Sequence, residues 1–380
     1  MKKRTLLTTL AILALLPASS QTREEALAEF DWFTGFVSRN YLGYETKTQG
    51  KEHEWKAWTD SLRNSVAQRP DTLPCLIDEY VQRFKDRHMW VNTTNQGQIQ
   101  FHDLLQRVRA RYRARHKPET TNMYYTAKPM NDSTYFLRIP SFADSTSNQI
   151  IKDNWNAITS RPYLIVDLRC NGGGNDESFD ALMALTYSGP YLTHGVEQYA
   201  TPDFLDFFKD IIAHEPQSEW RDYLQELTDS MENHLGDYVL RPGMQRLRLV
   251  RRDTVYQNPR RIGLLIHGRN ASSAEQYILE AKESEKVVLF GNERTSGTLD
   301  LSNVFAITSP SGWLKLYIPT TRSCRWPDIV IDRKGIAPQI PIPYEESRIE
   351  ALQEKDGIGE EIRYIERVLR GLPCPGTAEQ

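Results

Sequence analysis

Two segments of this chain share a pattern in which a continuous apolar run enters a turn of small residues and is followed by a helical repeat. Residues 163–174 are Tyr-Leu-Ile-Val-Asp-Leu-Arg-Cys-Asn-Gly-Gly-Gly, and residues 261–275 are Arg-Ile-Gly-Leu-Leu-Ile-His-Gly-Arg-Asn-Ala-Ser-Ser-Ala-Glu. Continuous apolar strands are typical of a parallel sheet that is covered on both faces. A strand that turns tightly into a helix presents backbone N–H groups or a hydroxyl at the edge of that sheet. The two segments therefore predict an α/β core with candidate reactive groups at its edge.

The order of the remaining elements supports the same fold class. Strands are expected at 135–139, 163–166, 262–267, 286–290, 303–307, 314–318 and 328–332, and helices at 150–158, 179–185 and 272–284. Strands that alternate with helices favour an α/β core with substantial parallel pairing. We expect a signal peptide at 1–20, an N-terminal helical domain at 21–130, a core at 131–345 with an insertion at about 190–256, and a C-terminal helical tail at 346–380.

The N-terminal domain is predicted to be helical because its apolar residues recur at helical spacing. Amphipathic helices are expected around 27–33, 55–62 and 76–84. Residues 103–115 form a basic helical stretch, which we interpret as a solvated helix face rather than a binding patch.

The first twenty residues have the pattern of a secretory signal peptide. Lys2, Lys3 and Arg4 precede an apolar run that ends at Leu16, and small residues follow up to Ser20. The apolar run is too short to span a membrane comfortably. We therefore expect cleavage near Ser20, export to the periplasm or the extracellular space, and no membrane span in the mature chain.

Composition and cysteine usage limit the partners and cofactors. The net charge of −3 and the 26% of charged residues favour neither a nucleic acid nor a membrane surface as partner. The cysteines, Cys75, Cys170, Cys324 and Cys374, lack the spacing of a zinc site, and no metal or cofactor is expected. Export permits disulfides, but the pairing stays open, and Cys170 is either a packed thiol or a partner of Cys324.

Ser272 and Ser273 stand where the second turn enters its helix. A serine at this place can cap the helix, with its oxygen accepting an N–H of the first turn. It can also be a nucleophile, because the helix N-terminus and the next N–H stabilise developing negative charge. The glycines at 172–174 also allow two interpretations. They form a tight turn between strand and helix, or they supply N–H donors for an oxyanion.

The motifs taken together resemble the tail-specific (C-terminal processing) and tricorn-core serine peptidases. Asp167-Leu-Arg-Cys-Asn-Gly-Gly-Gly174 resembles their Asp-Leu-Arg-x-Asn-x-Gly-Gly signature, and the segment 270–275 resembles their Ser-Ala-x-Glu helix. The segments 135–142, 287–297 and 334–338 are similar to the entry strand, the Val-x-Gly-Glu-x-Thr-x-Gly segment and the Gly-Ile-x-Pro-Asp segment. The resemblance covers about 133 to 343, in the family's order.

The resemblance implies a crotonase/ClpP-like core of stacked ββα units and hydrolysis of a peptide or protein substrate. It assigns the nucleophile to Ser272, and the oxyanion donors to the N–H groups of Ser273 and of Gly172 or Gly173. It requires no metal or cofactor, and it allows an oligomer. The stretch between His88 and the strand at 135–139 is too short for a PDZ domain, since small domains have roughly 100 residues.

The chain departs from the family at three positions. Thr298 stands where the tail-specific branch has its lysine base, Arg87 stands where the tricorn branch has a serine, and Gln339 replaces an aspartate. The tricorn branch takes its base from an Asp-x-His segment, which corresponds here to Asp86-Arg87-His88. A serine needs a base near neutral pH, and His88 is the candidate, although without the resemblance it is an ordinary residue ending a helix.

The carboxylate that would orient this base is less defined. Asp332 is the candidate, with Asp86 and Glu275 as weaker ones, and we interpret His267 as packing near the site. Two hypotheses follow from these residues: an active serine peptidase with a histidine base, or an inactive family member that binds peptides or another ligand in the same cleft.

Overall fold

Both turn motifs lie in one five-stranded sheet with the strand order β10-β9-β4-β3-β2. This computed structural model describes residues 21–115, 124–343 and 358–373, so the predicted signal peptide lies outside the described residues. The strands of this sheet are β2 (Thr126–Pro129), β3 (Thr134–Arg138), β4 (Tyr163–Asp167), β9 (Arg261–Leu265) and β10 (Val287–Phe290). All are parallel except β2. Asp167 pairs with Leu265, so the two turns leave the sheet at the same edge.

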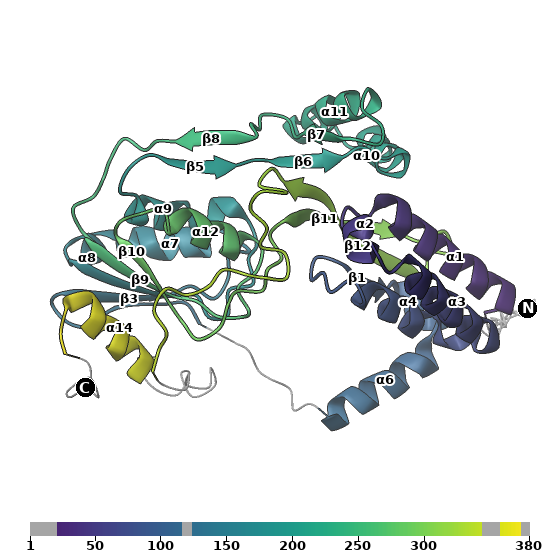
Figure 1. Cartoon of the computed structure of the whole chain (residues 1–380), viewed down its shortest axis with the longest axis horizontal. Helices are drawn as coiled ribbons and strands as arrows, with labels where there is room; N and C mark the ends of the chain where they lie inside the picture. Colours follow the sequence, from purple (N-terminus) through teal and green to yellow (C-terminus); the bar gives the residue numbers. More distant parts are fainter. Residues whose placement is uncertain (1–20, 116–123, 344–357, 374–380) are drawn as a thin grey trace, which may run out of the picture.

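Helices cover both faces of this sheet, which explains the continuous apolar runs. Figure 1 shows one group of helices above the sheet and α14 below it. The upper group is α7 (Thr146–Asp153), α8 (Trp155–Thr159), η2 (Asp176–Phe179), α9 (Asp180–Thr186) and α12 (Ser273–Ala281), and α14 is Glu360–Arg370. Leu164 and Val166 of β4 belong to the upper hydrophobic cluster, while Ile165 belongs to the cluster under α14. This alternation is the period-two geometry of a strand.

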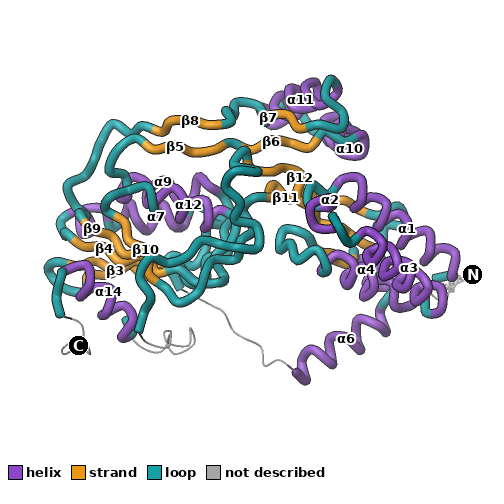
Figure 2. The backbone as a smooth tube through the Cα atoms, viewed as in Figure 1, coloured by secondary structure: helices purple, strands orange, loops and turns teal. Residues whose placement is uncertain are grey.

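A second lobe is built around the antiparallel strand β12 (Figure 2). Its N-terminal elements are α1 (Arg23–Asn40), α2 (Tyr44–Thr48), α3 (Glu52–Gln68), η1 (Pro70–Thr72), α4 (Leu73–Gln82), β1 (Trp90–Thr93), α5 (Asn95–Gln100) and α6 (His102–Arg115). The hairpin β11 (Leu301–Thr308) and β12 (Leu314–Ser323) joins them, because β12 pairs with both β1 and β11. The helical lobe is thus hydrogen-bonded, through β1, to a hairpin that follows α12 in the sequence.

The segment expected as an insertion at 190–256 contributes to both lobes. Its elements are β5 (Tyr191–His194), β6 (Val196–Tyr199), α10 (Pro202–His214), α11 (Glu219–Glu232), β7 (Tyr238–Leu240) and β8 (Leu247–Val250). β5 pairs with β8 as a ribbon above α12, and β6 pairs with β12 and β7 (Figure 1). Buried residues of α10 and α11, such as Phe204 and Leu227, share one hydrophobic cluster with those of α1, α3 and α4. The insertion therefore bridges the core and the helical lobe.

Several element predictions need correction. Residues 328–332 are turns and loop rather than a strand, and the helix expected at 150–158 is divided between α7 and α8. Cys75, Cys170 and Cys324 are free thiols, and Cys374 lies outside the described residues. Across the described ranges, no helix combines the length and the apolar character needed to cross a membrane.

The β4 turn is anchored by a buried ion-pair network. Asp167 accepts hydrogen bonds from Arg138 Nε at 2.9 Å and from Arg169 at 2.9 and 2.8 Å, and Arg169 Nη1 binds Glu361 of α14 at 2.9 Å. Asp167 and Arg169 are fully buried. Burial alone would raise the pKa of Asp167, but the two guanidinium groups outweigh it and hold this pKa well below its usual range. The network joins the edge of the sheet to α14.

Asp167→Asn is expected to lower the free energy of unfolding by about 3–5 kcal/mol at pH 7, because it leaves two buried guanidinium groups without their shared carboxylate. Since the folded-state pKa of Asp167 is lowered, its contribution is present above the unfolded-state value of about 3.9 and is lost as the pH falls below that value. Urea denaturation followed by circular dichroism measures both effects. The exposed pair Lys56–Asp60 supplies the control Asp60→Asn, for which we expect less than about 1 kcal/mol. Equal losses in the two variants would contradict this account.

Candidate active site

Ser272 occupies a strained position at the start of α12. Its φ of 55° and ψ of −129° lie outside the regions that residues with a Cβ normally adopt. Within the described residues its side chain makes no capping hydrogen bond, so the capping interpretation of Ser272 is not realised. Such strain is concentrated at functional sites, and a serine on a sharp turn between strand and helix has its hydroxyl exposed. The local backbone therefore favours the nucleophile interpretation.

The glycine turn lies against Ser272 at backbone contact distance. A Cβ built on Gly173 would lie 2.6 Å from the Ala271 carbonyl oxygen and 2.8 Å from Ser272 Cβ, so this position requires glycine. The Gly173 N–H donates to Asn171 Oδ1 at 2.9 Å. The N–H groups of Gly172 and Ser273, by contrast, have no protein partner in the ranges that the structure describes. Of the two candidate glycines, Gly172 has the available donor.

Asn270 fixes the distance between the two turns. It is fully buried, and its Nδ2 donates to the carbonyl oxygens of Leu168 at 2.5 Å and Asn171 at 3.0 Å. Its Oδ1 accepts from the His267 N–H at 2.7 Å. One side chain thus satisfies backbone groups of both turns, which explains why an asparagine precedes the serines.

Thr298 lies beside Ser272, at the position that the resemblance assigns to a lysine base. Its Oγ1 accepts the Ser272 N–H at 3.2 Å and donates to Glu275 Oε2 at 3.1 Å. Glu275 also accepts the backbone N–H groups of Gly297 and Thr298 and the hydroxyl of Thr295. Glu275 therefore organises the loop at 295–298, and in the part of the chain that the structure describes it makes no hydrogen bond to a histidine. The Thr298 side chain holds the backbone of Ser272.

His88 reaches the site from the helical lobe. Its Nδ1 lies 2.6 Å from the carbonyl oxygen of Leu301, at the start of β11. A carbonyl oxygen only accepts, so Nδ1 carries the proton and Nε2 is left as an acceptor. The His88 N–H donates to Asp86 Oδ1 at 2.9 Å. This is the tautomer that a general base requires.

Ser272 and His88 line the same cleft, which has a volume of about 900 Å³. Gly172, Gly174 and Ser273 form part of its wall, as do Ser302–Phe305 of β11. No direct hydrogen bond joins the His88 and Ser272 side chains within the described residues. Catalytic hydrogen bonds are often long in ligand-free enzymes and tighten when substrate binds. The cleft thus brings together the serine, the imidazole and the two available N–H donors.

Within the described ranges, no hydrogen bond or ion pair joins Asp332 to His88, and the Asp332 carboxylate is paired with Lys47. Its carboxylate lies 3.4 Å from Lys47 Nζ, and the backbone N–H of Asp332 donates to Asp300. The group that holds the His88 ring is the Leu301 carbonyl rather than a carboxylate. A carbonyl fixes the tautomer as a carboxylate does, but it adds no full negative charge beside the imidazole.

Comparison with known families supports what the geometry indicates. The Peptidase family S41 model matches residues 133–342, which is more than half of the chain. The chain belongs to peptidase family S41. This is a serine peptidase family, and the match spans the four parallel strands of the core sheet, both turns and the β11–β12 hairpin. No curated protein sequence matches the chain.

Two solved structures show the fold of this S41 chain. Mature CPAF aligns with a TM-score of 0.60 at 11% identity, covering 93% of this chain and 99% of that one. A candidate peptidase from Parabacteroides merdae aligns with a TM-score of 0.55 at 14% identity, covering 95% and 100%. At these identities the likeness concerns architecture. The expected crotonase/ClpP-like core with a helical N-terminal region is confirmed.

The sequence motifs missed a second imidazole in the cleft of this S41 peptidase. His194, the last residue of β5, lines the cleft with His88. Burial and the nearby Arg325 guanidinium lower the pKa of His194, which keeps it neutral near pH 7. It belongs to the segment at 190–256, which carries no recognisable motif, so no sequence signal pointed to it.

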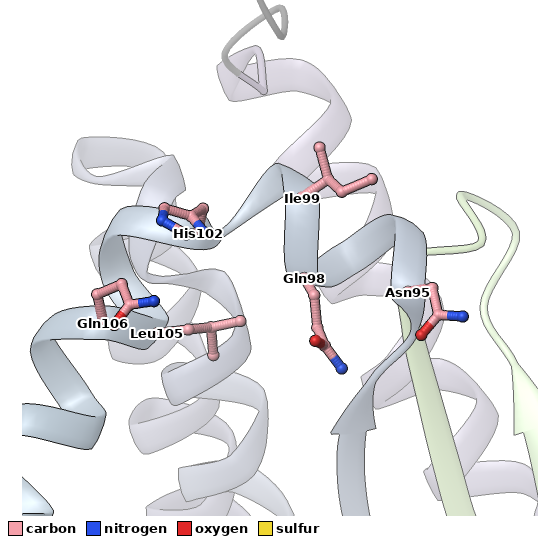
Figure 3. Close-up of a pocket in the computed structure, with 6 residues that line it drawn as sticks. All are labelled: Asn95, Gln98, Ile99, His102, Leu105 and Gln106. Atoms are coloured by element: carbon pink, nitrogen blue, oxygen red, sulfur yellow. The ribbon is translucent and has the colours of Figure 1, made fainter.

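A separate pocket of about 450 Å³ lies between α5 and α6. Figure 3 shows its six lining side chains, which are Asn95, Gln98, Ile99, His102, Leu105 and Gln106. These residues include no serine, cysteine or carboxylate. The cleft that contains Ser272 is therefore the better candidate for an active site.

Proposed function

We propose that this protein is an exported serine peptidase that uses Ser272 as nucleophile and His88 as general base. The observation that carries the proposal is the cleft, in which a strained serine, an imidazole in the base tautomer and two available N–H donors meet. Ser272 Oγ would attack the carbonyl carbon of a peptide while its proton passes to His88 Nε2. The imidazolium then protonates the leaving amine, and water hydrolyses the acyl-enzyme by the same route.

The oxyanion of the tetrahedral intermediate would be held by the N–H groups of Ser273 and Gly172. Ser273 is the first residue of α12, so the helix dipole adds to its N–H. Donors of this kind typically contribute a factor of about 10² to 10³ each, since they are oriented before the charge develops. Gly173 contributes differently, because its lack of a Cβ allows the glycine turn to approach Ser272.

The substrate would be an extended peptide or an unfolded protein segment. β11 pairs with β12 and with no other described strand, and its residues Ser302–Phe305 line the cleft. An unpaired strand edge can bind an extended backbone through main-chain hydrogen bonds. Such a peptide would pass His88, which contacts the carbonyl at the start of β11. The basic start and apolar run of residues 1–20 support export.

Two observations favour a second candidate function, an inactive member that binds peptides. The family lysine is replaced by Thr298, and His88 and Ser272 are not hydrogen-bonded to each other in the described structure. A binding protein would keep the cleft and the β11 edge without turning over its ligand.

Labelling with a fluorescent, serine-directed phosphonate distinguishes the two functions. We expect the reagent to label the mature chain, and peptide mapping to locate the adduct on Ser272, because only an activated hydroxyl attacks phosphorus at a useful rate. The heat-denatured protein and Ser272→Ala serve as controls and should stay unlabelled. Absence of labelling, together with binding of unmodified peptides, would support the binding protein instead.

A further inference from the structure

A buried lysine connects the turn that carries His88 to the loop beside the nucleophile. Lys47 Nζ, on α2, lies 3.8 Å from Asp86 Oδ2 and 3.4 Å from Asp332 Oδ2. The exposed fractions of the three side chains are 6%, 2% and 13%. Buried charges are costly unless they are paired, so Lys47 sits where two carboxylates would otherwise repel each other.

The first carboxylate holds the backbone of the base. Asp86 Oδ1 accepts the His88 N–H at 2.9 Å, and Asp86 Oδ2 accepts the Tyr41 hydroxyl at 2.7 Å. Asp86 therefore binds the His88 turn through one carboxylate oxygen and the end of α1 through the other. Movement of Asp86 would move the peptide group of His88 with it.

The second carboxylate belongs to the core. The N–H groups of Ile331 and Asp332 donate to Asp300 Oδ2, each at 2.7 Å. Asp300 lies between Thr298, which accepts the Ser272 N–H, and Leu301, whose carbonyl accepts from His88. The pair Lys47–Asp332 therefore joins the helical lobe to the loop that contacts both catalytic candidates.

A further contact joins Arg87, the residue before His88, to the core. Arg87 Nη1 donates to Ser296 Oγ at 2.5 Å, and Ser296 Oγ donates to the Gly268 carbonyl at 2.9 Å in the nucleophile turn. Asp86 and Arg87, the two residues before His88, are thus both connected to the core. This arrangement limits the freedom of the His88 ring relative to Ser272.

We propose that Lys47 is a positioning residue that fixes the His88 turn relative to the loop beside Ser272. The proposal rests on the proposed function. Buried ion pairs often add little net stability compared with apolar packing, so a role in fixing geometry is a better account of this one. Its two carboxylates come from different lobes, whereas a purely local pair would join residues of one lobe.

The surroundings of Lys47 define how its removal acts. The charged and titratable groups around it are Asp86 and Tyr41 from the helical lobe and Asp300, Asp332 and Arg333 from the core. Burial raises the pKa of Asp332, Lys47 lowers it and Asp86 raises it further. Removing the ammonium therefore leaves Asp86 and Asp332 without their shared cation, and it breaks the only link that Lys47 makes between the two lobes among these groups.

Four variants separate positioning from charge. Lys47→Met is expected to lower kcat about 10- to 100-fold with little change in KM. Lys47→Met/Asp332→Asn restores the wild-type net charge without the bridge, so its kcat should stay low. Lys47→Arg should keep most of the activity, because it can span the same carboxylates. Lys56→Met, at an exposed pair on α3, should match the wild type.

Hydrogen exchange provides a readout that does not depend on catalysis. Peptides covering residues 86–93 should lose protection at least about tenfold in Lys47→Met and keep it in Lys56→Met, with mass spectrometry as the measurement. A wild type without peptidase activity would refute the proposed function, while exchange would still decide whether Lys47 holds the turn. Unchanged kcat and unchanged exchange in folded Lys47→Met would overturn the inference.

Discussion

Replacement of Ser272 by alanine is expected to lower kcat for peptide hydrolysis by about 10⁴- to 10⁶-fold. The change removes the only atom that would form the acyl-enzyme, and it leaves both proposed oxyanion donors in place. Residual hydrolysis would come from the N–H donors and from substrate positioning alone. The measurement is the rate of cleavage of a fluorogenic peptide library by the purified mature chain.

A matched replacement tests whether the strain at Ser272 is real. Ser272→Ala keeps a Cβ at φ 55°, so its free energy of unfolding should equal that of the wild type. Ser272→Gly removes the Cβ, so its free energy of unfolding, measured by urea denaturation, should be about 1 kcal/mol higher. Both variants lack the hydroxyl and should be inactive. Hydrolysis by Ser272→Ala at the wild-type rate would refute the nucleophile assignment. A Gly variant less stable than the Ala variant would refute the strain.

The core of this fold could be predicted because its signals are local. The apolar run at 163–166 and the glycines after it specify β4 and its turn within a dozen residues, and the segment at 262–284 does the same for β9 and α12. Continuous apolar strands implied coverage on both faces, and Leu164 and Ile165 do contact helices on opposite sides. Local pattern and tertiary packing agree at these positions.

The packing of the helical lobe and the position of His88 depend on contacts between residues that are far apart in the sequence. Nothing in Trp90–Thr93 indicates pairing with β12, yet that pairing places the His88 turn beside the β11–β12 hairpin. The apolar residues at 328–332 suggested a strand, but the N–H groups of Ile331 and Asp332 bind the Asp300 side chain instead of a neighbouring strand. The same loop directs Asp332 to Lys47 rather than to His88. The His88 ring is bound instead by the Leu301 carbonyl, a backbone group that neither composition nor spacing could indicate.

His88→Gln is expected to lower kcat/KM by about 10⁴-fold or more near pH 7, because the serine would lose its proton acceptor. Glutamine has nearly the size of histidine and can still donate to the Leu301 carbonyl, so the lobe contact should survive. Steady-state kinetics with a fluorogenic peptide measure the loss of kcat/KM.

The second imidazole of the cleft supplies the control. His194 lines the same cavity, and burial with the nearby Arg325 lowers its pKa, but it is carried by the β5–β8 ribbon rather than by the helical lobe. His194→Gln should therefore stay within about tenfold of the wild type, as expected for a residue that touches substrate without taking the proton. If His194→Gln abolished cleavage while His88→Gln preserved it, the base would come from the ribbon. The helical lobe would then serve only to close the cleft.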